Sequence, residues 1–181
     1  YLEVYNGSDS SIDLNDYVLA YCLNECATDG VWESVQVFSN NTFFPTATRT
    51  IASGGVYVIR DNNGDVSATI KNAADGKNPN MKISGNDPVA LLRKETGFSA
   101  AKVKAGDTSV YTVMDTIGDP VNPATTSSVC GTSNGLTDHV LIKKENKQGN
   151  TSWTSSKGTD ASDCDWAVSY THLRAHETEE N

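Results

Sequence analysis

Hydrophobic and polar residues alternate at the start of the chain in a pattern that predicts two strands. In residues 1–5, Leu2 and Val4 fall on one face and the intervening residues fall on the other. The Asn-Gly pair at 6–7 is a tight-turn signal. Residues 17–23 then alternate again, after a polar loop. The chain therefore opens as the beginning of an antiparallel sheet.

Later segments carry the same signal, which is a short run of β-branched or aromatic residues closed by glycine, proline, asparagine or aspartate. Strands are expected at residues 31–38, 56–60, 89–93, 110–117 and 140–144, with weaker strand patterns at 66–70 and 98–104. The segments between them, including 71–80, 121–135 and the stretch from 145 to Cys164, are polar and are expected to be loops. No segment keeps a helical period over ten residues, so the pattern predicts an all-β antiparallel sandwich with little helix.

Composition and charge narrow the classes of partner. The 181 residues are enough for one domain that buries roughly 70% of the surface of its unfolded form. The net charge of −9 argues against direct binding to nucleic acid, because phosphates are recognised by faces rich in lysine and arginine. It also argues against an anionic membrane surface. No apolar run is long enough to span a bilayer, so no membrane span is expected.

The four cysteines lack the spacing of a zinc site. Cys22 and Cys26 have three residues between them and no histidine nearby, and Cys130 and Cys164 are isolated. Two disulfides in an oxidising compartment are the favoured interpretation. Cys130 paired with Cys164 would close a loop around the strand at 140–144, and Cys22 paired with Cys26 would close a small ring. Sequence alone leaves the alternative cross-pairing open.

Three triplets fit the glycosylation sequon, beginning at Asn6, Asn40 and Asn150. They matter only in a eukaryotic host, and such triplets arise by chance in loops rich in Asn, Ser and Thr.

Short pieces spread over nearly the whole chain carry a family resemblance. They lie at residues 1–6, 13–17, 51–59, 85–92, 115–119, 138–144, 149–153 and 163–166. In this order they resemble the lamin-tail type of immunoglobulin-like domain of secreted microbial proteins. The resemblance implies an immunoglobulin-like β-sandwich without a catalytic centre, often carried beside a secreted nuclease, phosphoesterase or other enzyme. In such relatives a further strand usually precedes the piece at 1–6, so we interpret the chain as part of a longer protein.

The end of the chain departs from that pattern. Residues 169–181 look like a translated sequencing-adapter sequence, and we hypothesise that they are not native. The expected domain is therefore residues 1–168.

Histidine chemistry is weakly indicated. His139 follows Asp138, but neighbouring strand residues point to opposite faces, so Asp138 is not placed to orient the imidazole. No Gly-x-Ser-x-Gly elbow accompanies them. His172 and His176 have helical spacing, yet they lie in the suspect tail and lack a third ligand. We expect no catalytic residue and no cofactor.

Acidic loops invite a calcium hypothesis. Asp160, Asp163 and Asp165 fall in one loop, and Asp61 and Asp65 fall in another. Calcium takes six to eight oxygen ligands, and neither loop has EF-hand spacing. Aspartate is also common in turns for backbone reasons, so no metal site is expected.

The tryptophans offer a carbohydrate hypothesis. Trp32, Trp153 and Trp166 could form a sugar-stacking platform, although a sandwich normally buries its tryptophans in the core, which is the favoured interpretation.

We therefore expect a monomeric, extracellular, non-catalytic module that positions a neighbouring domain of the same polypeptide or binds a protein or surface partner. The alternatives are a fragment of a secreted nuclease or phosphoesterase whose catalytic domain is missing, and a carbohydrate-binding module.

Overall fold

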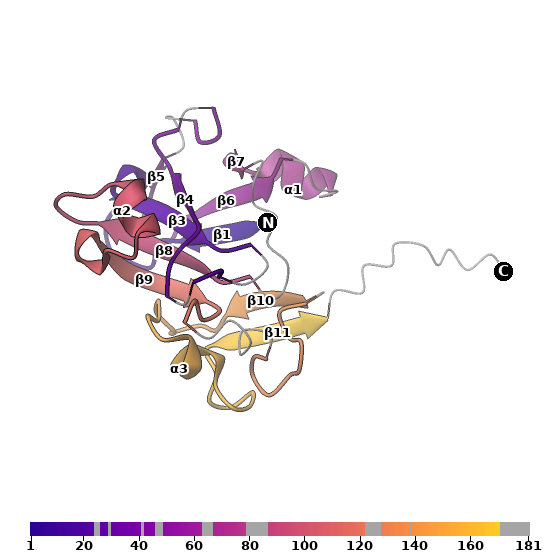
Figure 1. Ribbon diagram of the computed structural model, residues 1–181. Coiled ribbons are helices and arrows are strands. Elements are labelled where there is room, and N and C mark those ends of the chain that lie inside the picture. The colour runs from indigo at the N-terminus through magenta and orange to yellow at the C-terminus, as the bar shows by residue number, and fades with distance from the viewer. Residues whose placement is uncertain are drawn as a thin grey trace.

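A computed structural model describes residues 1–23, 26–28, 30–40, 42–45, 49–62, 67–78, 87–121, 128–137 and 139–170. Over these ranges the regular secondary structure is mostly strand, in layered and largely antiparallel sheets with three short α-helices (Figure 1). The expected all-β fold with little helix is therefore confirmed. Within the same ranges, no helix has the length and apolar character needed to cross a bilayer.

A four-stranded antiparallel sheet forms the centre of the fold. Its order is β4 (Ser34–Val37), β3 (Tyr17–Tyr21), β8 (Val89–Lys94) and β9 (Tyr111–Ile117). Successive residues of β3 and β8 are buried on opposite faces, because the sheet is covered on both sides. In β9 an extra residue produces a bulge: Leu91 pairs with Asp115 and Leu92 with Val113.

A second sheet covers one face of the first. It consists of β1 (Leu2–Tyr5), β6 (Val56–Asp61) and β7 (Gly76–Asn78), and the β6–β7 pair is parallel. Val4 and Tyr57 from this sheet pack in one core cluster with Leu19 from the central sheet. Each inward side chain of β1 alternates with an outward one, as the sequence pattern predicts. The short pair β2 (Ile12–Asp13) and β5 (Thr50–Ile51) adds to the same layer of core.

The opposite face of the central sheet is covered by helix and loop. Val103 of α2 (Ala100–Lys104) and Val110 of the 3₁₀ helix η3 (Thr108–Val110) pack with Trp32 and the Cys22–Cys26 pair. A second 3₁₀ helix, η1 (Leu14–Asp16), leads into β3. The side chains of α2, η3, Trp32 and the Cys22–Cys26 pair belong to one buried cluster with alternate residues of β3 and β8, which are Val18, Ala20, Ala90 and Leu92. Leu14 of η1 belongs to the cluster on the other face.

The C-terminal part of the described chain forms a third unit beside β9. Strands β10 (His139–Lys143) and β11 (Trp166–Tyr170) pair antiparallel, and α3 (Trp153–Lys157) packs against them (Figure 1). Sequence analysis did not predict β11, and it assigned Ser169 and Tyr170 to a non-native tail. The structure includes both residues in the strand, opposite Val140 and His139. Residues 171–181 lie outside the described ranges.

The three helices correct the strand and loop predictions for these segments. The weak strand patterns expected at 66–70 and 98–104 give way to α1 (Ala68–Ala73) and α2, and α3 lies in an expected loop. Each helix follows a serine whose hydroxyl accepts the N–H three residues ahead, which satisfies a donor of the first turn. These N-cap residues are Ser67, Ser99 and Ser152.

Strand β7 lies in a segment that we expected to be loop. Gly76 makes this possible, because a Cβ at this position would lie 2.7 Å from the Phe44 ring and 2.9 Å from the Tyr57 hydroxyl. The backbone of β7 can therefore approach the core closely. The sequence did not indicate this strand, because its neighbours are polar and because its close packing depends on Gly76 having no side chain.

Candidate functional site

Both disulfides are present in the pairs that the sequence analysis favoured. Cys22 joins Cys26 beside Trp32, and Cys130 joins Cys164 inside the C-terminal cluster. Within the described chain, therefore, no thiol of these four residues is available as a nucleophile or a metal ligand.

The three tryptophans are core residues. Their exposed fractions are 3% for Trp32, 2% for Trp153 and 5% for Trp166. The rings of Trp153 and Trp166 lie 6.5 Å apart, and the indole N–H of Trp166 donates to the Ser156 hydroxyl at 2.7 Å. A sugar-stacking platform needs exposed ring faces, so this trio does not form one. The favoured expectation of core burial holds.

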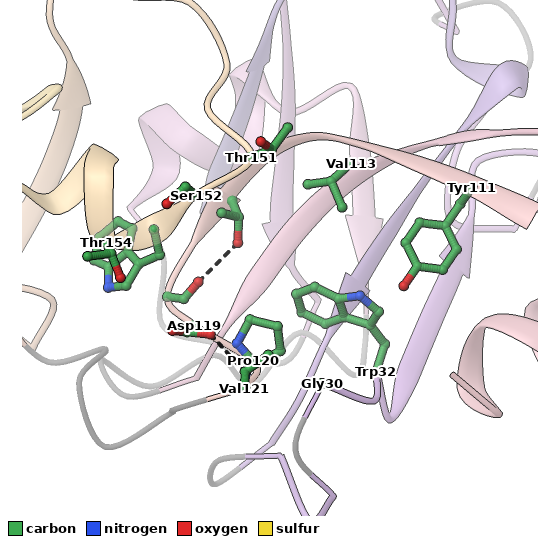
Figure 2. Close-up of a pocket in the computed structure, with 13 residues that line it drawn as sticks. Gly30, Trp32, Tyr111, Val113, Asp119, Pro120, Val121, Thr151, Ser152 and Thr154 are labelled. Carbon is green, nitrogen blue, oxygen red and sulfur yellow. Dashed lines mark hydrogen bonds between the residues drawn. The ribbon is translucent and has the colours of Figure 1, made fainter. Parts of the chain in front are cut away.

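Two of these tryptophans nevertheless border the same pocket. It has a volume of about 310 Å³ and lies where the central sheet meets the start of α3 (Figure 2). Its wall includes Trp32, β9, the turn after β9, and the segment that leads into α3. The residues that line the pocket include Trp32, Tyr111, Val113, Asp119, Ser152 and Thr154.

Aromatic side chains form the buried side of the pocket. Figure 2 shows the Tyr111 hydroxyl directed toward the Trp32 indole, whose side chain donates a hydrogen bond to it. Burial raises the pKa of Tyr111 above its ordinary value, and the Trp32 hydrogen bond only partly offsets that rise. The phenol is therefore neutral at physiological pH and acts as a wall rather than as a base.

The polar lining groups bond to the local backbone. A carboxylate oxygen of Asp119 accepts the Val121 N–H at 2.8 Å, and the Thr116 hydroxyl donates to the Gly118 carbonyl at 3.0 Å. The Ser152 hydroxyl serves as the N-cap of α3. Such a lining can hold a small apolar group against Trp32 and Val113, with hydroxyls at the rim. It supports binding better than proton transfer.

In the loop that contains Asp160 and Asp163, the carboxylates accept hydrogen bonds from groups of the same loop. A carboxylate oxygen of Asp163 accepts the Asp160 N–H at 2.9 Å, and the Thr159 hydroxyl donates to the same carboxyl group. These bonds hold the pKa of Asp163 below its usual range, the Asp160 N–H having the largest effect. Asp165 instead lies 3.0 Å from the Lys147 ammonium. No group of three or more potential metal ligands occurs in the described ranges, and Asp65 lies outside them.

The histidine hypotheses find little geometric basis. A ring nitrogen of His139 contacts the Thr137 carbonyl, and the side chain lies at the start of β10. Asp138, His172 and His176 lie outside the described ranges, so their predicted roles stay untested.

An exposed apolar face lies on the outside of the second sheet. Tyr1 and Tyr5 project from β1 and its start, with exposed fractions of 54% and 65%, and Val56 of β6 is 45% exposed. Tyr5 and Val56 are directly paired across the two strands. These are three of the five large apolar side chains that are exposed in the described chain. We call the surface formed by Tyr1, Glu3, Tyr5 and Val56 the outer β1 face.

The sequence indicated some residues of the outer β1 face and of the pocket, but not which of them lie together in the fold. It placed Tyr1 and Tyr5 on the face opposite Leu2 and Val4, and aromatic residues on a polar face were the available signal. Nothing local in the sequence indicated that Tyr111 would meet Trp32, because loop packing brings them together.

Comparison of the chain with protein-family models, with curated proteins and with solved structures finds no match.

Proposed function

We propose that the chain is a non-catalytic, extracellular interaction module of the lamin-tail, immunoglobulin-like type. It holds a protein or surface partner, or positions a neighbouring domain of the same polypeptide. The outer β1 face carries this proposal. Exposed tyrosines with fixed neighbours are typical of binding surfaces, since Tyr supplies large contact area at low entropic cost.

The setting of Tyr5 supports the proposal. A Cβ added to Gly7 would lie 3.3 Å from the Tyr5 ring, so the ring rests on the glycine backbone. One ring face is therefore supported while the side chain stays 65% exposed. An aromatic side chain held in this way loses little freedom when a partner covers it.

The disulfides support the extracellular part of the proposal. Disulfides such as Cys130–Cys164 persist in oxidising compartments and are rare in a reducing cytosol. The net charge of −9 further disfavours a nucleic-acid partner.

A site-specific photo-crosslinker tests the proposal. The crosslinking amino acid replaces Tyr5 in one variant and Ile142 in a control, because Ile142 is 58% exposed on β10 and lies outside the outer β1 face. Both proteins are incubated with the proteins secreted by the source organism. A discrete product from position 5 and not from position 142 is expected. Equal labelling from both positions, or none from position 5, contradicts the proposal.

Hydrolysis assays test the competing enzyme hypothesis. The purified chain is incubated with DNA, RNA and bis(p-nitrophenyl) phosphate, with and without Mg²⁺ and Ca²⁺. No turnover is expected. Turnover that copurifies with the chain would instead assign it a nuclease or phosphoesterase activity.

A further inference from the structure

A second pocket is lined by residues of β6, β7 and helix α1, which lie side by side in Figure 1. Its volume is about 170 Å³. The lining includes three cationic side chains and one carboxylate, which are Arg60, Lys71, Lys77 and Asp75. The chain as a whole has a net charge of −9, so this pocket is a local excess of positive charge on an acidic protein.

Arg60 and Lys77 are cross-strand partners in the β6–β7 pair. Neighbouring strands lie about 4.8 Å apart and partner residues project from the same face, so these two cationic side chains start next to each other. The preceding residues, Ile59 and Gly76, are directed to the core, which places Arg60 and Lys77 on the outer face. Two like charges at such positions repel, and an anion between them reverses the sign of the interaction.

The described residues form no ion pair with the three cations of this pocket. The ion pairs of the described chain all lie elsewhere, and they are Arg93–Glu95, Lys143–Asp115 and Lys147–Asp165. Arg60 donates to the Asp61 carbonyl at 3.0 Å and has further N–H groups in its guanidinium fork. Among the same residues, no hydrogen bond engages the ammonium groups of Lys71 and Lys77.

The nearby carboxylates are held in other places. An oxygen of Asp75 accepts the Val58 N–H at 2.9 Å, which ties this carboxylate to the backbone of β6. Glu3 lies opposite Val58 on β1, and β6 separates it from Lys77. At physiological ionic strength the screening length is about 8 Å, so more distant carboxylates have little effect on an anion in the pocket.

The size and wall of the pocket indicate what it can hold. Pockets for drug-sized ligands have volumes of roughly 300–1,000 Å³, so this smaller pocket suits a single small group. Phe43 and Pro45 add an apolar wall beside the cations. An anionic group with an attached carbon substituent can therefore contact both parts of the lining.

We propose that this pocket binds a phosphate monoester. Such a group carries a charge of about −1.5 to −2 at pH 7 and three acceptor oxygens, which matches several converging cations. The Arg60 guanidinium can donate two parallel N–H bonds to phosphate, while Lys71 and Lys77 act as point charges. The pocket lies outside the outer β1 face, so the inference does not depend on the proposed interaction function.

A ligand titration tests the inference on the whole ¹⁵N-labelled chain by two-dimensional NMR at about pH 7.5. Phenyl phosphate should shift the backbone amides of Gly76 and Lys77 in a saturable way. It should bind at least about threefold more tightly than phenyl sulfate, which carries a single negative charge, and than inorganic phosphate, which lacks the apolar group. Equal affinity for phenyl sulfate overturns the choice of phosphate. Equal affinity for inorganic phosphate overturns the choice of an ester.

The pH dependence provides a second readout. The second pKa of a phosphate monoester is about 6, so phenyl phosphate becomes a monoanion in mild acid. Its advantage over phenyl sulfate should therefore disappear below about pH 5. An advantage that persists there overturns recognition of the dianion.

A charge-removing variant locates the site. Lys77→Gln should weaken phenyl phosphate binding by about tenfold or more, because it removes one of three cations around the group. Lys104→Gln is the matched control, since it makes the same change of net charge at an exposed position on α2. Its affinity should change less than about twofold. Equal weakening in both variants overturns the assignment to this pocket.

Thermal unfolding separates lost binding from lost folding. Without ligand, Lys77→Gln should unfold at the same temperature as the unmodified protein or at a higher one, because repulsion from Arg60 is removed. Phenyl phosphate should raise the thermal midpoint of the unmodified protein and leave that of the variant unchanged. An equal rise in both proteins, or a lower midpoint of the variant without ligand, overturns the role assigned to Lys77.

Discussion

Lys143 and Asp115 join the C-terminal unit to the edge of the central sheet, with the ammonium nitrogen 2.6 Å from a carboxylate oxygen. The same carboxylate accepts the Asn150 N–H at 2.9 Å, and the Lys143 nitrogen lies 4.4 Å from the centre of the Trp166 ring. Asp115 reaches these groups from β9, next to the bulge. One half-buried ion pair therefore ties β9, β10 and β11 together.

Removing the Lys143 cation should loosen this junction. Lys143→Met keeps much of the aliphatic stem but leaves the Asp115 carboxylate without its counter-charge. We expect the free energy of unfolding to fall by about 1–3 kcal/mol, measured by urea denaturation. Lys104→Met, at an exposed position on α2, should change it by less than about 0.5 kcal/mol. A comparable loss in both variants would contradict the role assigned to the ion pair.

Asn6 should resist conversion to aspartate. Its amide nitrogen donates to the carbonyls of Ser10, Ile51 and Ala52 at 2.8, 2.9 and 3.1 Å, and the residue is 3% exposed. Asn6→Asp replaces this donor with an anionic oxygen facing carbonyls. The free energy of unfolding should fall by about 2–3 kcal/mol.

Asn40→Asp is the matched control for that substitution. The Asn40 side chain accepts the Thr42 N–H at 3.1 Å, and a carboxylate can accept the same bond. The thermal midpoint of the Asn40→Asp variant should stay close to that of the unmodified protein. The burial of Asn6 also means that glycosylation of its sequon is incompatible with this fold.

The two disulfides should contribute unequally to stability. The 34-residue separation of Cys130 and Cys164 corresponds to about 3–4 kcal/mol in the chain-entropy model, against roughly 2 kcal/mol for the four-residue separation of Cys22 and Cys26. Paired Cys→Ser variants measured by denaturant unfolding should preserve this order. A larger loss from the Cys22–Cys26 variant would show that packing beside Trp32 outweighs loop closure.

Acid should destabilise the loop that contains Asp163. Its pKa is lowered in the folded state by the N–H of Asp160 first and then by Thr159. The folded state therefore binds fewer protons, so this stabilisation is present above the unfolded value of about 3.9 and is lost as pH falls through the folded pKa.

Asp163→Asn should be destabilising at neutral pH, and its difference from the unmodified protein should shrink below about pH 4. Denaturant unfolding at several pH values measures this difference. Asp9→Asn changes an exposed aspartate with no hydrogen bond among the described residues and serves as the control. A difference that stays constant with pH would contradict the assignment.

Alternation and turn chemistry were sufficient to predict the strands with regular neighbours. Residues 1–5, 56–60 and 89–93 became β1, β6 and β8 with small changes at their ends. The period of two residues is visible in β1 because one face is exposed. The strand at residues 17–23 was also predicted from alternation, which implies one exposed face, but β3 is buried on both faces.

The missed elements depend on contacts that are distant in sequence. Strand β11 lies next to the Cys130–Cys164 pair, and Trp166 is buried there with Trp153. Its Ser169 and Tyr170 pair with β10 although they read as part of a foreign tail. The short helices were within reach of sequence reasoning, because Ser67 and Ser99 are N-cap residues. These helices have only five or six residues, which is too short for a helical period to stand out against the weak strand-like alternation of the same segments.

The alternation within β1 assigns neighbouring residues to separate tasks. Val4 is 5% exposed and packs between the two sheets, whereas Tyr5, the next residue, is 65% exposed and lies beside Gly7. Positions 1, 3 and 5 can therefore change in sequence while the fold is maintained by positions 2 and 4. A lineage could alter what this strand presents to solvent, one outward residue at a time, without passing through unfolded intermediates.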